Sequence, residues 1–143
     1  MSRTAAPVHL RWEYVALVLV GGSIGTAGRY LLTSVLPSWH DVPVGTLVAN
    51  VTGAFLLGLL LEALVRRGPD QGSRRVVRLL VGTGVLGGFT TYSSFAVETD
   101  GLLRAADVAP ALIYAAATLV LGLVATSAGI VVGARSSRPG GHG

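Results

Sequence analysis

The sequence GGFTTYSSF at residues 87–95 places a dense group of hydroxyl side chains inside an otherwise apolar stretch. Five of its nine residues carry a hydroxyl, and two adjacent glycines precede them. Gly87 and Gly88 are expected to loosen a helix, and a broken helix frees backbone carbonyls that can coordinate a small cation. We therefore expect a functional helix break. The alternative is a glycine kink whose hydroxyls bond the preceding turn.

Further uncharged polar side chains recur at four-residue spacing in two other apolar stretches, which puts each pair on one helix face. These pairs are Thr46 with Asn50 and Tyr114 with Thr118. With the ring edges of Tyr92 and Phe95, they offer hydrogen-bond donors and positive quadrupole charge without a full charge. That chemistry suits a small, strongly hydrated anion that must also be released. For any single residue, a hydrogen bond that joins two helices explains the pattern equally well.

The elements that must position these side chains are four apolar segments, at residues 14–36, 44–65, 76–103 and 108–134. Each is long enough to cross a hydrocarbon layer, which takes roughly 20 residues. The chain of 143 residues is 51% hydrophobic and 13% charged, against about 25% charged in soluble domains. We predict an all-α membrane protein with one four-helix domain at 14–134, a polar lead at 1–13 and a disordered tail at 135–143.

Several function classes are excluded by the residue types present. The chain has no cysteine, so disulfides and thiolate metal sites are excluded. His9, His40 and His142 lie outside the apolar segments, and no nucleophile–base pair is apparent, so we do not expect an enzyme. The net charge of +4 fits nucleic acid or an anionic membrane surface, and the hydrophobicity favours the membrane. The first apolar run exceeds a signal-peptide core of roughly 7–15 residues, so we expect it to be retained.

The arginines are distributed unevenly between the two sides that four spans would define. Nine belong to the side of both termini: Arg3, Arg11, Arg66, Arg67, Arg74, Arg75, Arg78, Arg135 and Arg138. The other side has Arg104, and Arg29 lies within the first span. Because cytoplasmic loops carry the excess of arginine and lysine, both termini are predicted to be cytoplasmic.

Three motifs occur in order: GGSIGTAGRY in the first apolar segment, PVGTLVANVTGAFLLG in the second and GGFTTYSSF in the third. In these motifs, and over most of its length, the chain resembles the Fluc (CrcB-type) fluoride channels. The resemblance implies subunits of four transmembrane helices, with the third helix broken near its centre, that pair as antiparallel dimers in the bacterial plasma membrane. It also implies two fluoride pores, a central structural sodium ion and passive export of fluoride from the cytoplasm.

The resemblance assigns roles to individual residues. It implies that the main-chain carbonyls of Gly87 and Thr90 hold the sodium ion, and that Arg29 has a structural or vestibule role. The implied pore residues are Asn50, Tyr92, Phe95, Ser93, Ser94, Tyr114, Thr118 and Thr46. Two positions depart from the family pattern: Tyr92 replaces the common phenylalanine, and Gly122 replaces a hydroxyl residue one turn after Thr118.

Two other functions and one question of assembly stay open on the sequence. A small multidrug-resistance exporter would need a membrane-embedded carboxylate, whereas Glu13 is at the edge of the first segment and Glu62 and Glu98 are expected near span ends. A non-transporting assembly subunit would bury the uncharged polar side chains of the apolar segments, which costs free energy, without any function that needs them. The arginine bias favours one orientation, hence a heterodimer with an oppositely oriented homologous subunit. The alternative is an antiparallel homodimer.

Overall fold

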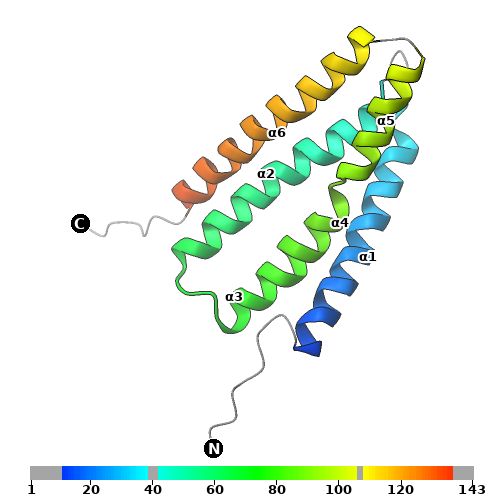
Figure 1. Cartoon of the computed structure of the whole chain (residues 1–143). Coiled ribbons are helices and arrows are strands. Elements are labelled where there is room, and N and C mark those ends of the chain that lie inside the picture. Colours follow the sequence, from blue (N-terminus) through cyan, green and yellow to red (C-terminus); the bar gives the residue numbers. More distant parts are fainter. Residues whose placement is uncertain (1–10, 39–41, 106–107, 137–143) are drawn as a thin grey trace, which may run out of the picture.

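The computed structural model describes residues 11–38, 42–105 and 108–136, and these residues are almost entirely helical (Figure 1). The predicted lead and tail fall largely outside the described residues. The elements are α1 (Trp12–Val35), α2 (Val44–Arg66), α3 (Gly72–Val77), the π-helix η2 (Arg78–Leu86), α4 (Gly87–Phe89), α5 (Tyr92–Arg104) and α6 (Val108–Ser136).

Three helices in the described part of the chain, α1, α2 and α6, are long and apolar enough to cross a membrane. Their bounds agree with the predicted segments to within two residues at each end. The agreement reflects a local cause, because a bilayer requires an uninterrupted apolar run of a set length. The chain is therefore an all-helical protein with several candidate membrane spans.

The third predicted segment, 76–103, is divided into four shorter elements, α3, η2, α4 and α5. Helical conformation stops at Thr90 and Thr91, whose backbones are extended, with ψ values of 155° and 125°. Gly87 and Gly88, which were expected to loosen the helix, lie in the short α4 helix immediately before the break and are themselves helical. The π-helix was not predicted. Such wide turns recur at functional sites.

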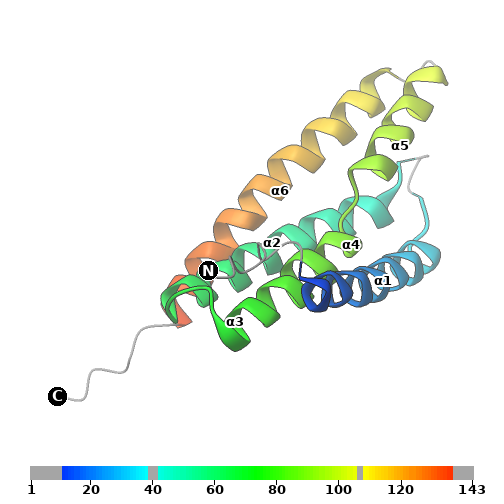
Figure 2. The ribbon, with the colours of Figure 1, turned by 60° about the horizontal axis from the view of Figure 1, so that its bottom comes forward.

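The helices pack as two close pairs, which Figures 1 and 2 show from different sides: α2 lies beside α6, and α1 lies beside η2 and α4. Glycines permit both contacts. A Cβ atom on Gly25 would overlap the Val85 carbonyl oxygen, and one on Gly129 would overlap the Phe55 carbonyl oxygen. Gly88 of α4 packs in the same way against Gly22 of α1. Because lipid offers helices no hydrophobic driving force for association, such close backbone contact holds the bundle together.

Replacing Gly25 by alanine is expected to destabilise the protein by about 1–3 kcal/mol, the usual cost of overpacking. Gly22→Ala is the matched control in the same helix, because a Cβ atom on Gly22 meets nothing within 4 Å. The control should be neutral or stabilised by about 0.5–1 kcal/mol, since alanine favours a helix over glycine. Thermal unfolding in detergent measures both. Equal stability of the two variants would contradict the packing described for α1.

Candidate functional site

The break between α4 and α5 is held open by one side chain from α2. The Thr91 backbone N–H donates to Asn50 Oδ1 at 2.7 Å, and Asn50 Nδ2 donates to the Thr91 carbonyl at 3.0 Å. An amide group has both a donor and an acceptor, so it can satisfy both backbone groups of one extended residue. Asn50 therefore replaces the hydrogen bonds that Thr91 would make in a continuous helix.

This arrangement removes the usual helical hydrogen-bond donors from the carbonyls of Gly87 and Thr90, the two that were predicted to hold a cation. In a continuous α-helix, the Gly87 carbonyl would accept from Thr91 N–H and the Thr90 carbonyl from Ser94 N–H. Thr91 N–H bonds Asn50 instead, and Ser94 N–H donates to Thr91 Oγ1 at 3.1 Å. Both carbonyls have thus lost their helical donors, which leaves their oxygens able to accept another partner.

The side chains of the two threonines at the break both bond nearby backbone groups. Thr90 Oγ1 donates to the Leu86 carbonyl at 3.0 Å, next to the bond that Thr90 N–H makes to the same oxygen at 2.9 Å. Thr91 is the N-cap residue of α5 and accepts from Ser94. The Thr90 hydroxyl bonds the preceding turn, as the kink alternative expected, but the extended backbones of Thr90 and Thr91 end α4 and start α5, so the helix is broken here and not only kinked.

Arg29, on α1, contacts both sides of the break. Its Nε donates to the Gly88 carbonyl at 3.3 Å, and its NH1 donates to Ser94 Oγ at 3.5 Å. Thr26 Oγ1 also donates to the Gly88 carbonyl, at 3.4 Å. The Gly88 oxygen therefore already has two donors, unlike the oxygens of Gly87 and Thr90. Arg29 joins α1 to both α4 and α5.

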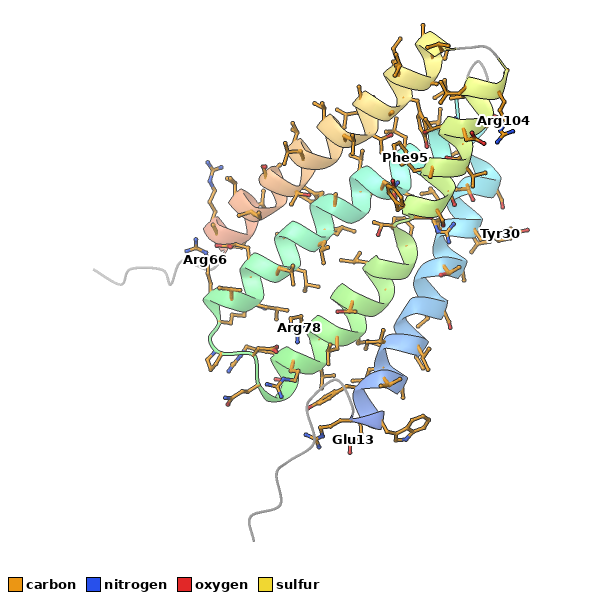
Figure 3. The ribbon with its side chains drawn as sticks, in the orientation of Figure 1. Glu13, Tyr30, Arg66, Arg78, Phe95 and Arg104 are labelled. Atoms are coloured by element: carbon orange, nitrogen blue, oxygen red, sulfur yellow. The ribbon has the colours of Figure 1, made fainter. Side chains whose placement is uncertain are left out.

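An open groove of about 420 Å³ begins at the break and runs between α2, α5 and α6. It is lined by Asn50, Ala54, Leu57, Thr90, Thr91, Tyr92, Phe95, Thr118, Leu119, Gly122 and Thr126. None of these residues is charged. Four of the predicted pore residues, Asn50, Tyr92, Phe95 and Thr118, thus share one groove, and the labelled Phe95 marks it in Figure 3.

The two departures from the family pattern both lie in this groove. Tyr92 is 80% exposed, and its ring centroid is 6.0 Å from that of Phe95. A Cβ atom on Gly122 would meet nothing within 4 Å, so the space beside this residue is open. Thr126, one turn beyond Gly122, also lines the groove and was missed from the sequence. Its four-residue spacing after Gly122 was the available signal.

Thr46 and Tyr114 belong to a separate cluster around Glu98 of α5. Thr46 Oγ1 and the Tyr114 hydroxyl each donate to a Glu98 carboxylate oxygen at 2.7 Å. Tyr114 is 2% exposed, and its ring lies 5.6 Å from that of Phe95. Glu98, expected near a span end, lies six residues before the end of α5 and is half-buried. Its spacing of three residues after Phe95 was the signal that it shares that face.

The predicted pore residues therefore divide into three groups. One group lines the groove and the second belongs to the Glu98 cluster. The third group is Ser93 and Ser94, which lie at the start of α5, both within 3.2 Å of Thr91 Oγ1. Thr118 Oγ1 donates to the Tyr114 carbonyl in its own helix, so its hydroxyl bonds locally. Phe95 lies between the groove and the Glu98 cluster, because its ring contacts Tyr114.

Apolar helices of spanning length, packed around an interrupted helix with an uncharged polar groove, define a multi-pass helical membrane protein. The family described as "CrcB-like protein, Camphor Resistance (CrcB)" matches residues 16–130, and the chain belongs to this family.

Three relatives are similar over nearly their whole length. The "Fluoride-specific ion channel FluC 2" of Leifsonia xyli is 56% identical over 132 residues, which cover 92% of this chain and 91% of the relative. The "Fluoride-specific ion channel FluC" of Deinococcus radiodurans is 46% identical, covering 87% and 95%. The "Fluoride-specific ion channel FluC 1" of Cutibacterium acnes is 45% identical, covering 86% and 90%.

Proposed function

We propose that this protein is a fluoride-selective channel that lets fluoride leave the cytoplasm passively. The observation that carries the proposal is the uncharged polar groove at the helix break, in a chain whose relatives are named fluoride-specific ion channels. Hydrogen fluoride crosses membranes and dissociates inside the cell, so an open anion path lets fluoride move down its gradient. The function is transport and requires no catalytic group.

The chemistry of the groove fits a small anion. Asn50 has two amide N–H donors, and only one of them is used by the Thr91 carbonyl. The rings of Tyr92 and Phe95 supply electropositive edges along the same groove. A fixed cation would hold fluoride too strongly to conduct it, and none lines the groove.

Liposomes test this function directly. We expect purified protein, alone or with a co-encoded homologous subunit, to release fluoride from loaded liposomes and to retain chloride under the same gradient. Protein-free liposomes and heat-inactivated protein are the controls. Chloride release as fast as fluoride release, with any required subunit present, would overturn the proposal.

The exporter alternative requires a carboxylate that exchanges protons and cationic drugs. Glu98 is the half-buried candidate, but its oxygens already accept bonds from Thr46 and Tyr114. Fluoride release that continues without a proton gradient supports the channel. Release that stops when the proton gradient is collapsed would favour the exporter.

We propose further that residues 72–104 cross the bilayer as a third span broken near its centre, and that two subunits pair antiparallel. The freed carbonyls of Gly87 and Thr90 support a central sodium ion, because a cation can replace the donors that they lost. The same two carbonyls of the second subunit would complete the shell of oxygen ligands around the sodium ion. The arginine-rich end of the bundle would face the cytoplasm of a bacterial cell.

Sodium is expected to stabilise the assembled protein. A ligand at a hundredfold excess over its Kd stabilises the native state by about 2.7 kcal/mol, so unfolding temperature should rise with sodium chloride. Choline chloride at equal ionic strength is the control. Protein prepared without sodium from cell lysis onward avoids an ion already trapped in the dimer. Equal stability in both salts after that preparation would contradict the site.

A further inference from the structure

Five arginines lie between the end of α2 and the start of η2, and they divide into two groups by their partners. Three pair with carboxylates. Arg66 bonds Glu62, while Arg75 and Arg78 both bond Asp70, at 3.4 Å and 2.8 Å. The hydrogen bond from Arg78 is the main cause that holds the pKa of Asp70 below its usual value. The charges of these three arginines are therefore balanced in part by neighbouring acids.

Arg67 and Arg74 lack such a partner. Among the residues that the structure describes, neither forms an ion pair, and Arg67 makes no side-chain hydrogen bond. Arg74 Nε donates to the Pro69 carbonyl at 2.9 Å, which orients the guanidinium and leaves its two terminal nitrogens available. Within the described part of the chain, the guanidinium groups of Arg67 and Arg74 thus have no balancing negative charge, and that of Arg74 is held in orientation by the Pro69 carbonyl.

Both of these arginines line the same groove, of about 350 Å³, between α2 and α3. Its polar rim consists of Arg67, Ser73 and Arg74, and its apolar wall includes Leu60, Leu64 and Val77. None of the paired arginines lines it. Figure 3 labels Arg66 and Arg78 near the two sides of this connection, at the end of the bundle that also holds Glu13. The groove therefore has a cationic rim at the bundle end and an apolar wall toward the bundle centre.

The sign of the electrostatic potential at the rim follows from comparing the helix dipole of α2 with the charges of the two arginines. α2 ends at Arg66, so the negative end of its dipole, equivalent to about half a charge, lies nearby. Two full positive charges outweigh it, and the guanidinium fork matches the oxygens of a phosphate group. The potential at the rim is therefore positive, and the Arg67 and Arg74 side chains are the charged groups of the groove that can bind an anion.

We propose that this groove binds an anionic phospholipid, with its phosphate on Arg67 and Arg74 and an acyl chain along Leu60, Leu64 and Val77. A soluble phosphate shares the headgroup chemistry but leaves the apolar wall without a ligand, whereas a lipid matches both parts. Basic pockets at the cytoplasmic ends of membrane helices are suited to such lipids. The inference does not depend on which ion the protein conducts.

Native mass spectrometry of the full-length protein in detergent tests the proposal, with phosphatidylglycerol, phosphatidylcholine and glycerol phosphate as probes. Wild-type protein should retain phosphatidylglycerol most strongly. Each arginine near a membrane surface contributes about a fivefold factor, so Arg67→Gln with Arg74→Gln should weaken retention about 25-fold. If that variant does not fold, Arg67→Gln alone gives the same test at about fivefold, because this guanidinium has no partner in the described chain to lose.

The matched control is Arg66→Gln with Arg75→Gln, which removes the same charge from the same end but leaves the groove intact. It should retain phosphatidylglycerol within about twofold of wild type, since only the general surface potential changes. Three results would each overturn the proposal. These are equal loss in the control variant, equal retention of phosphatidylcholine, or displacement of the lipid by glycerol phosphate at equal concentration.

Discussion

Asn50→Ala is expected to reduce fluoride flux at least tenfold while the helical bundle still assembles. Asn50 is the sole described partner of both backbone groups of Thr91. An unpaired buried donor or acceptor costs about 1–3 kcal/mol, and about 1.4 kcal/mol corresponds to a factor of ten. Thr91 should leave its extended conformation in the variant. The groove would then lose both its amide donor and the geometry of the break.

The measurement is fluoride efflux from liposomes, with size-exclusion chromatography to confirm assembly. Thr52→Ala is the control, because Thr52 lies on α2 near Asn50 but is exposed and outside the groove. A second variant, Asn50→Asp, keeps the acceptor for Thr91 N–H but places a negative charge beside the anion path. It should also lose flux while holding the break. Wild-type flux in Asn50→Ala would mean that the pore lies elsewhere.

A cysteine at position 71 is expected to stay unlabelled by an impermeant thiol reagent in intact cells, and to label fully once cells are opened. Gln71 is exposed in the α2–α3 connection, and the native chain has no cysteine. Seven described arginines lie at or near this end of the bundle: Arg11, Arg66, Arg67, Arg74, Arg75, Arg78 and Arg135. The opposite end has Arg104, bonded to Asp100 at 2.7 Å (Figure 3).

This distribution predicts one orientation, since arginine-rich connections resist export across the membrane. Ser38→Cys, at the opposite end, is the control and should label in intact cells. A single orientation would require an oppositely inserted homologous subunit to form an antiparallel dimer. Labelling of about half of the position-71 cysteines would instead establish a dual-topology homodimer and remove the need for a second subunit.

The apolar spans were readable from the sequence because the bilayer imposes a local rule, a run of apolar residues of sufficient length. The same is true of the arginine asymmetry and of the hydroxyl-rich motif. Each depends on residues close together in the chain. In α2, the small residues Gly45, Ala49 and Gly53 recur every four residues along the sequence, and all three are buried.

The position of the helix break and the hydrogen bonds that support it depended on contacts between segments that are distant in the sequence. Asn50 and Thr91 are separated by 41 positions, and their hydrogen bonds place the break at the threonines rather than at the glycines. Glu98 became part of the polar network only because α2 and α6 bring Thr46 and Tyr114 to it. Composition alone could not separate paired from unpaired arginines, since the turn after α2 decides which guanidiniums reach Asp70. Local patterns thus determined which helices are long and apolar enough to cross a membrane. Tertiary packing decided which polar groups satisfy one another and which stay available to another partner.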